Sequence, residues 1–515
     1  MKKIFFATAL LLASICGYSQ DIYQVAELST QDLNGTARYM GMGGAMGALG
    51  GDISTMSSSP AAIGLYRRSD VAVTASLVTQ PGGYEFDGKH NIYVSFDQLG
   101  FVYSLPITEG SPLKFVNIGV NYHKQRDFNQ LTASSANLAD REYASQTWQL
   151  ADLCNFWEGD DKATPLAWMA YQTLLLGGDA EQGYSAYGAE SHYYNKARWG
   201  SNQAFDFNLS FNLQDQWYFG LTASAYNVVQ KSTMAYTEDL FLKDEGRRDG
   251  YYTLLNDNSL KGTGYDVKFG VIVRPVRNSN FKIGLTLASP TFYELTYRNN
   301  SWLNTYETQW GSNDLPPYYL DYDYKVRTPW RLNLSVGNTF FNKLAIGAEY
   351  EFADYSTTSV SYGDGFDDWD DSKDHYLNRE AHHYLKGTHT LKLGAELTPV
   401  RNLYLRAGYN YVTSAIDKNA FLNQYINSAS VDASTSTDYL NTSSIKRYTV
   451  GAGVKFGSFY ADATWLYQCQ NGKLYTFSAS EDGSLNAVPS SLNVCPSRHV
   501  KLNKSQFAIS VGYRF

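Results

Sequence analysis

The feature that most constrains this chain is a strict alternation of apolar residues with small or polar residues through its last ten positions. One face of residues 506–515 is apolar and comprises Phe507, Ile509, Val511, Tyr513 and Phe515. The other face comprises Ala508, Ser510, Gly512 and Arg514. Because successive side chains of a β-strand point to opposite faces, this pattern predicts a strand with lipid on one side and water on the other.

The same alternation recurs in residues 205–213, 344–352, 403–411 and 448–456. Some positions on the second face are charged, such as Asp206, Glu349 and Arg406. Charged side chains would be costly to bury in the core of a soluble sandwich, whereas they fit a water-filled lumen. The repeats therefore predict several strands of one barrel wall.

The connections between the predicted strands alternate in length. Short links lie near residues 106–114, 214–216, 276–280, 341–342, 399–402 and 457–458. Long polar segments lie near residues 129–200, 231–260, 299–320, 362–385, 416–445 and 470–504, and the shorter link 81–89 opens the series. This asymmetry predicts an all-β fold, a transmembrane antiparallel β-barrel of about 14 strands. We expect segments 137–176 and 237–244 to add helical turns at the extracellular mouth.

The N-terminus has the three-part layout of a secretory signal peptide. Two lysines follow the first methionine, a mostly apolar run comes next, and Gly17 and Ser19 place small residues before a cut at Gln20. We therefore predict a signal peptide at residues 1–19, which is too short to span a bilayer. Lipoprotein processing at Cys16 is an alternative that the preceding isoleucine disfavours.

The composition agrees with export to the outer membrane of a Gram-negative cell. Tyrosine is as frequent as glycine, at 42 residues each, and aromatic girdles at the two membrane interfaces would use many of them. The net charge of −8 argues against a nucleic-acid partner. We expect a monomer in contact with outer-membrane lipid and lipopolysaccharide.

Residues 20–68 do not alternate and are rich in glycine and small residues, as in Gly41-Met-Gly-Gly-Ala-Met-Gly-Ala-Leu-Gly-Gly51. Such a segment can pack closely inside another structure. We predict that it forms a hatch inside the lumen of a barrel made by residues 69–515. The first wall strand, at residues 69–80, is then expected to pair with the last.

Three stretches carry a resemblance to the FadL/TodX family of outer-membrane transporters of long-chain fatty acids and other hydrophobic compounds. The first is Ala37-Arg-Tyr-Met-Gly-Met-Gly-Gly-Ala45 with Ser59-Pro-Ala-Ala-Ile-Gly64, which is similar to the family's hatch. The others are residues 328–356 and 393–409. The resemblance spans essentially the mature chain. It implies passive uptake of hydrophobic compounds such as long-chain fatty acids, with release controlled by the hatch.

The hatch motif departs from the family at one position, because Ser59 stands where the family has asparagine, while Pro60 and Ala61 match. In the family this motif lies against a kink in the third strand, where a lateral opening releases the substrate. The resemblance implies a gating role for these three residues, with the third strand at residues 115–128. The alternative is a proline that starts a helix or turn within a plug.

Apolar residues in the long loops are candidates for first capture of a hydrophobic small molecule: Leu240, Phe241, Leu242, Trp302 and Leu303. Burial of roughly 200 Å² of ligand at about 25 cal/mol/Å² would supply about 5 kcal/mol, which suits transient binding. The terminal Phe515 resembles the signal that the barrel-assembly machinery reads, which makes that machinery a partner during biogenesis. A non-transport surface protein for adhesion or envelope structure is the alternative function, followed by haem-related uptake.

The sequence gives only weak signals for a disulfide, a metal site or a catalytic site. Cys469 and Cys495 lie in one late segment and are a possible disulfide, which would leave Cys154 free. No spaced pair accompanies the loop histidines, and the aspartates near residues 364–374 lack the spacing of a calcium loop, so we expect no metal and no cofactor. No Gly-x-Ser-x-Gly elbow is present, so we expect no enzyme, although a barrel enzyme with a compact catalytic cluster stays an alternative.

Overall fold

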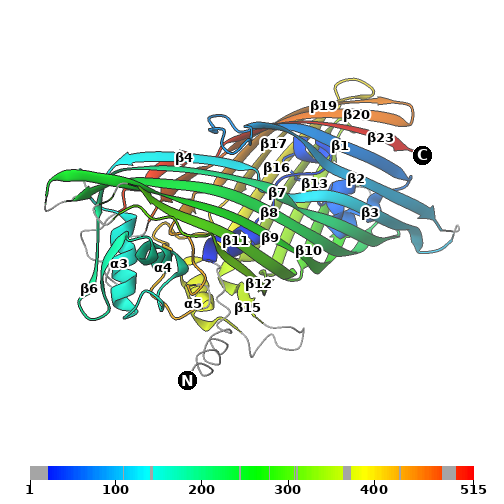
Figure 1. Cartoon of the computed structure of the whole chain (residues 1–515). Helices are drawn as coiled ribbons and strands as arrows, with labels where there is room; N and C mark the ends of the chain where they lie inside the picture. Colours follow the sequence, from blue (N-terminus) through cyan, green and yellow to red (C-terminus); the bar gives the residue numbers. More distant parts are fainter. Residues whose placement is uncertain are drawn as a thin grey trace.

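The computed structural model describes residues 21–515 apart from 108–109, 140–142, 243–244, 278, 307, 309–310, 363–372, 429–430 and 478–494. The predicted signal peptide and most of the aspartate-rich loop therefore lie outside the described residues. Over the described residues, the wall is a closed antiparallel β-barrel of 14 strands, which confirms the predicted fold class (Figure 1).

Ten wall strands are continuous over the described residues. They are β1 Asp70–Thr79, β2 Ile92–Pro106, β7 Gly188–Leu213, β8 Trp217–Leu242, β9 Arg247–Val273, β16 Gly387–Leu397, β17 Leu403–Val412, β19 Ile445–Phe456, β20 Phe459–Cys469 and β23 Lys504–Arg514. The other four are each broken into two segments. They are β3 Leu113–Asp127 with β4 Gln130–Asn137, β10 Lys282–Ala288 with β11 Phe292–Tyr306, β12 Tyr318–Arg327 with β13 Arg331–Phe340, and β14 Leu344–Asp354 with β15 Ser359–Ser361. Pro290 and Pro329 stand in two of the breaks, where a residue without an amide hydrogen cannot continue the ladder.

The ring closes between its first and last strands. The pairing of β1 with β23 runs without a shift from Asp70 opposite Arg514 to Thr79 opposite Ser505. The apolar residues of β23, such as Ile509 and Val511, are about half exposed on the outside, whereas Ser510 is fully buried. The alternation in the sequence therefore becomes an apolar outer surface and a polar inner surface, as predicted.

Strands β7, β8 and β9 are much longer than the rest of the wall, with 26, 26 and 27 residues. They extend past their neighbours on one side of the barrel (Figure 1). The predicted loop at residues 231–260 and the helical turn at 237–244 are therefore wrong, because β8 and β9 pair almost to the connection between them. Above the membrane both faces of a strand can be polar, so these segments lack the alternation that marks the rest of the wall.

The extensions of β7–β9 carry a folded extracellular layer that we call the cap. Its helices are α3 Gln146–Phe156, α4 Pro165–Gln172 and α5 His375–Tyr384. The short helix η4, Tyr355–Thr357, lies in the wall between β14 and β15. The small sheets of the cap are β5 Leu176–Asp179 with β6 Gly183–Ala186, and β18 Tyr439–Thr442 with β21 Asn471–Tyr475 and β22 Arg498–Lys501. Helices α3 and α4 occur where the sequence predicts them. Across the part of the chain that the structure describes, no helix is long and apolar enough to span a membrane.

The residues before β1 form four short helical elements: α1 Ile22–Ser29, α2 Ala37–Gly41, η1 Ile53–Met56 and η2 Pro60–Leu65. They lie within the ring of strands (Figure 1) and contact strands on opposite sides of it. The Ala37 amide donates to Ser510 of β23 at 2.6 Å, whereas Asn117 of β3 donates to the Ile63 carbonyl at 2.8 Å. These contacts are those that a hatch would make, and we keep that name for residues 21–68.

Inward-facing glycines of the wall let the hatch backbone come close. A Cβ atom added to Gly408 of β17 would lie 2.2 Å from the Gly43 amide nitrogen, and one on Gly394 of β16 would lie 2.3 Å from the Met42 carbonyl oxygen. A larger residue at either position would displace the hatch. The glycines of the wall are therefore the counterpart of the small residues of the hatch.

Candidate functional site

Helix α1 lies in the lumen with one apolar face and one polar face. Asp21 caps it, since its carboxylate accepts a hydrogen bond from the Gln24 amide at 2.7 Å. Ile22, Val25 and Leu28 are buried against inward-facing residues of β8–β12. That surface is rich in tyrosines, namely Tyr226, Tyr293, Tyr297, Tyr322 and Tyr324.

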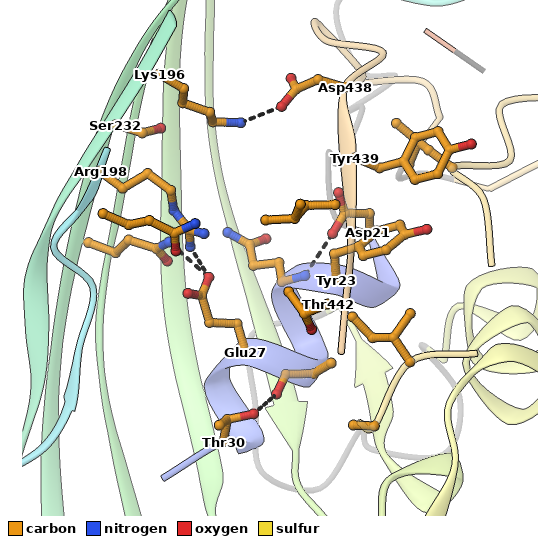
Figure 2. Close-up of a pocket in the computed structure, with 18 of the residues that line it drawn as sticks. Asp21, Tyr23, Glu27, Thr30, Lys196, Arg198, Ser232, Asp438, Tyr439 and Thr442 are labelled. Atoms are coloured by element: carbon orange, nitrogen blue, oxygen red, sulfur yellow. Dashed lines mark hydrogen bonds and ion pairs between the residues drawn. The ribbon is translucent and has the colours of Figure 1, made fainter. Parts of the chain in front are cut away.

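A cavity of about 260 Å³, which we call the lumenal pocket, adjoins the polar face of α1 (Figure 2). Its lining comes from α1, from the inner faces of β7 and β8, and from the cap segment that precedes β18. Tyr23 and Tyr439 bring aromatic rings to it, with centroids 5.6 Å apart. The pocket therefore combines aromatic surface with many polar groups.

The cations that face the lumenal pocket are paired with carboxylates. Lys196 Nζ lies 2.8 Å from Asp438 Oδ2, and Arg198 forms an ion pair with Glu27. Arg126 lies 2.8 Å from Asp32 Oδ1. These three pairs neutralise the inward-facing cations of the pocket; Lys231 of β8 also belongs to the lining, but its side chain is exposed.

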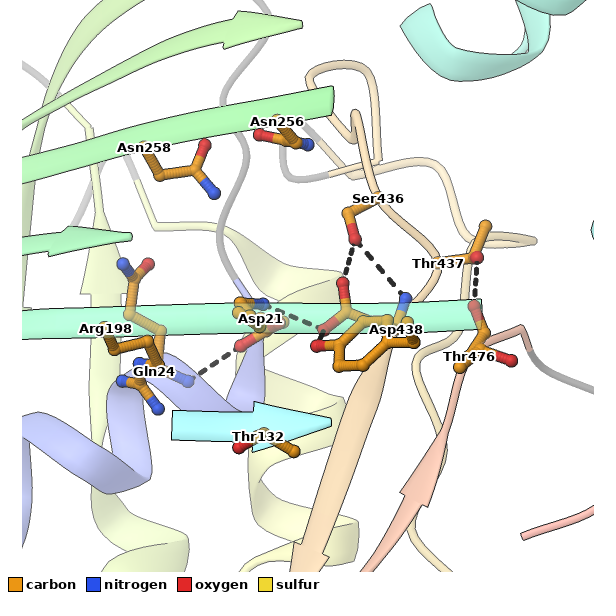
Figure 3. A network of polar contacts seen from close by, with 12 residues as sticks. Asp21, Gln24, Thr132, Arg198, Asn256, Asn258, Ser436, Thr437, Asp438 and Thr476 are labelled. Carbon is orange, nitrogen blue, oxygen red and sulfur yellow. Dashed lines mark hydrogen bonds and ion pairs between the residues drawn. The ribbon is translucent and has the colours of Figure 1, made fainter. Parts of the chain in front are cut away.

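Hydrogen bonds hold the cap segment and α1 in place around the pocket (Figure 3). Asp438 accepts from the Tyr194 hydroxyl at 2.7 Å and also accepts from Ser436. Burial opposes ionisation of Asp438, but Lys196 and these hydrogen bonds outweigh it and lower its pKa. Asp21 has no cation within ion-pair distance among the described residues, and burial raises the pKa of its carboxyl.

Below α1 the lumen is filled by the hatch and by buried ion pairs. Arg406 of β17 lies 2.6 Å from Glu396 and 2.5 Å from Asp462. Arg38 of the hatch also pairs with Glu396, at 2.9 Å. A separate cavity of about 70 Å³ between the hatch and the wall is lined mainly by polar side chains, including Arg447. The described residues thus offer no wide apolar route straight through the barrel.

The wall has an unpaired stretch between β2 and β3. Their ladder runs from Gln98 opposite His123 to Pro106 opposite Phe115 and stops there. Beyond it, residues 92–96 pair with β1 alone, Asp97 lies at a shift in that register, and the outer part of β3 with β4 pairs with β7 alone. We call this stretch the β2–β3 slit.

Side chains bridge the slit where the backbone does not. Lys124 Nζ donates to Ser95 Oγ at 2.6 Å, and the Tyr93 hydroxyl donates to Asp127 at 3.2 Å. On the outside, Val94 and Phe96 of the same stretch are exposed, which places the slit at the level of the apolar surface. A small cavity of about 40 Å³, lined by residues of the hatch and of both strands, lies behind it.

The predicted gating motif lies away from the slit. The Pro60 carbonyl accepts from Ser210 of β7 at 2.9 Å, and Ser59 donates to the Gly47 carbonyl at 3.3 Å. A Cβ on Gly270 of β9 would lie 3.0 Å from the Ala61 amide nitrogen. Pro60 begins η2, so the alternative of a helix-start proline describes its local role. The third strand does break, directly after Asp127.

The predicted capture residues are not on open loops. Leu240, Phe241 and Leu242 belong to β8, while Trp302 and Leu303 belong to β11. Leu240 and Leu303 are fully buried in the apolar core of the cap, and Phe241 stacks on Tyr143 at 4.0 Å. The prediction that they form a loop site is wrong, because the strands continue through these residues.

The predicted disulfide is also absent, since Cys469 and Cys495 are both free thiols, as is Cys154. Cys469 ends β20, whereas Cys495 is buried in the cap beside Phe477 and Leu138. Sequence reasoning missed the residues of the lumenal pocket, because Glu27, Lys196 and Asp438 come from segments far apart in the chain. The one local signal was Asp21, an N-cap residue before an apolar run.

Comparison with solved structures agrees with this architecture. A FadL homologue of Pseudomonas aeruginosa matches with a TM-score of 0.54 and 13% identity, over 94% of this chain and 99% of that chain. The toluene transporters TbuX of Ralstonia pickettii and TodX of Pseudomonas putida match with TM-scores of 0.47 and 0.48, both at 12% identity over 94% of this chain and 99% of theirs. No known family profile and no curated protein matches the sequence. The chain is therefore an outer-membrane β-barrel with the fold of the FadL homologue.

Proposed function

We propose that the protein is a passive outer-membrane channel for hydrophobic small molecules, which enter the lumenal pocket and leave through the β2–β3 slit. The observation that carries the proposal is the unpaired wall beside a lumen that is filled below α1. Arg126 and Gln130, on the β3–β4 side of the slit, line the pocket, so a molecule held next to α1 lies beside the slit, which faces the apolar outer surface. The free energy of an apolar molecule falls when it moves from water to lipid, so transport requires no energy source.

The size and lining of the pocket fit brief binding. Burial of roughly 200 Å² of apolar ligand surface at about 25 cal/mol/Å² supplies about 5 kcal/mol before ordering costs. The tyrosines of the lumen provide that apolar surface, as in the ring pair Tyr23 and Tyr439. Fatty acids are the substrate class that the sequence resemblance suggests.

We further propose that the hatch must shift for the slit to open. Asn34 of the hatch donates to Asp97 of β2 at 3.3 Å and to the Lys124 carbonyl of β3 at 3.1 Å, so it joins the two edges of the slit. Asp32 of the hatch holds Arg126 of β3 at 2.8 Å. Movement of residues 32–34 would remove these links together.

A disulfide between hatch and wall tests this movement. Ala37 and Ser510 lie close enough for one, since the Ala37 amide is 2.6 Å from Ser510 Oγ. In cells that carry A37C with S510C, uptake of a labelled long-chain fatty acid should fall several-fold under oxidising conditions and recover after reduction. The two single variants are the controls. Equal uptake in the oxidised and reduced double variant would show that α2 need not move away from β23, and would restrict the proposed movement to residues 32–34.

Transport itself is tested by comparing uptake in cells with and without the gene, across fatty acids and monoaromatic compounds. Equal uptake for every compound would reject the channel. It would favour the second candidate, a surface protein, which the apolar core of the cap supports: that core makes the extracellular layer a folded unit rather than a set of loops.

A further inference from the structure

Several polar atoms of the lumenal pocket lack a partner within the described residues. Gln230 Oε1 and Thr388 Oγ1 are buried atoms without a hydrogen bond, and their residues are 8% and 5% exposed. The Ser232 hydroxyl points toward the pocket in Figure 2, but it is not one of the buried atoms without a partner. A buried polar group without a partner costs free energy, so Gln230 Oε1 and Thr388 Oγ1 mark places where a ligand would bind.

The vacant positions include both donors and acceptors, since Arg126 Nε, which also lines the pocket, is a buried donor without a partner in the described structure. Gln230 uses its amide nitrogen to donate to Glu27 at 3.2 Å, which leaves its carbonyl oxygen to accept. The Asp21 carboxylate accepts one backbone hydrogen bond and has no cation at ion-pair distance in the described structure, although Lys196 and Arg198 stabilise its charge from farther away. An acceptor is satisfied only by a donor, and Arg126 Nε only by an acceptor, so the pocket favours a head that both donates and accepts hydrogen bonds, as hydroxyl groups do.

The charges of the pocket lead to the same conclusion. Each of Arg126, Lys196 and Arg198 already faces a carboxylate, at Asp32, Asp438 and Glu27 respectively. An ionised carboxylate ligand would have to displace one of these partners and would lie near Asp21. The carboxylate of such a ligand can only accept hydrogen bonds, so it would leave Gln230 Oε1 without a donor.

We propose that the lumenal pocket selects an uncharged amphiphile whose head carries several hydroxyl groups, in preference to an ionised fatty acid. The inference rests on the proposed channel and names the class of molecule that it takes. The hydroxyls donate to Gln230 Oε1 and to the Asp21 carboxylate, and they exchange hydrogen bonds with Thr388 and Ser232. The rings of Tyr23 and Tyr439 cover the apolar part of the head or the start of the chain.

Three probes with the same twelve-carbon chain separate the possibilities: dodecyl maltoside, dodecanoate and dodecyltrimethylammonium. Binding to the full mature protein in lipid nanodiscs is measured at pH 7.5 by calorimetry, with each probe below its critical micelle concentration. We expect the maltoside to bind at least about tenfold more tightly than either charged probe, the difference that one or two hydrogen bonds supply. The trimethylammonium head has positive charge but no donor, so it separates donation from charge attraction.

Two variants locate the head. T388V removes a hydroxyl that has no partner within the described residues, and S232A removes one that points toward the pocket, so neither should weaken the fold. Combined, they should lower maltoside affinity about tenfold and leave dodecanoate affinity unchanged. The control is T263V, which makes the same change on the exposed outer face of β9.

The outcomes are distinct. Tighter binding of dodecanoate or of dodecyltrimethylammonium overturns the preference for a hydroxylated head, while the channel proposal stands. Equal maltoside affinity in the double variant and in T263V overturns the assignment to this pocket. Failure of all three probes to bind counts against both the head-group inference and the proposed channel.

Discussion

Arg406 is the residue on which the closed lower lumen most depends. Its guanidinium is almost fully buried and holds Glu396 and Asp462, while Glu396 in turn holds Arg38 of the hatch. The alternation in β17 predicts that this arginine faces the lumen, but alternation carries no information about its partners. Those partners come from β16, β20 and the hatch, so only the folded ring brings them together.

Replacing Arg406 with methionine leaves Asp462 buried without its cation. Removal of one member of a buried ion pair costs about 3 kcal/mol, so R406M should lower the free energy of unfolding by that order. The measurement is denaturant unfolding from lipid vesicles. R298M is the matched control, since Arg298 pairs with Asp321 on the exposed surface and should change stability by less than about 1 kcal/mol.

His192 makes the cap sensitive to acid. It is buried, neither ring nitrogen has a hydrogen bond in the described structure, and its ring lies tilted against that of Tyr236, with centroids 5.7 Å apart. Burial, with a smaller effect of Arg498, lowers the pKa of His192 to about 4. An unfolded chain takes up this proton near pH 6.5, whereas the folded cap resists it. Stability is therefore full above pH 6.5 and falls as the pH drops from 6.5 to 4.

The substitution H192F removes the group that takes up the proton but keeps an aromatic ring at this position. Between pH 7 and pH 4, H192F should lose less thermal stability than the wild type, by about 3 kcal/mol at the acid end. Burial raises the pKa of Glu238, which lies opposite on β8, but Glu238 is present in both proteins and its contribution largely cancels in the comparison. H383F, at an exposed histidine of α5, should follow the wild type. Parallel pH curves for H192F and the wild type would contradict the argument.

At the scale of elements, the sequence predicted most of the wall and little of the extracellular side. Lipid on one face and water on the other impose alternation, so the inner part of β7 and strands β14, β17, β19 and β23 were predicted from the sequence. The outer parts of β7–β9 and of β11 meet water and the cap instead, so Leu240 of β8 and Leu303 of β11 looked like loop residues. Pro290 and Pro329 were visible in the sequence, but a proline alone does not distinguish a break within a strand from its end.

The contact between hatch and wall can be tested at one glycine. In G408V, the new side chain would meet the backbone of residues 42–43, so the hatch should be displaced while the wall still forms. We expect faster entry of small hydrophilic antibiotics into cells, measured as a several-fold lower inhibitory concentration. A407V is the control, because Ala407 is the next residue on the same strand and faces outward. Unchanged antibiotic sensitivity in G408V, with normal amounts of folded protein, would mean that the hatch seals the lumen without this contact.

At the scale of the whole molecule, the protein has three structural layers, each with its own role. The apolar outer surface of the wall holds the barrel in the membrane, the hatch and its ion pairs close the lumen, and the cap on β7–β9 encloses the outer side of the lumenal pocket. The sequence predicted the wall because alternation is a local pattern, and the small residues of the N-terminal segment were the local signal behind the hatch hypothesis. The pocket has none, since its walls come from α1, β7, β8 and the segment before β18.

The pairing of β1 with β23 has a consequence for biogenesis. The contacts of α2 with β17, β19, β20 and β23 join residues several hundred positions apart, so the hatch cannot reach its final packing until the latest strands have been delivered. The seam that seals the ring is also the step that encloses the hatch. Assembly should therefore end in a single late, slow event in which seam and plug become protease-resistant together, with no long-lived intermediate that has a closed wall around an empty interior.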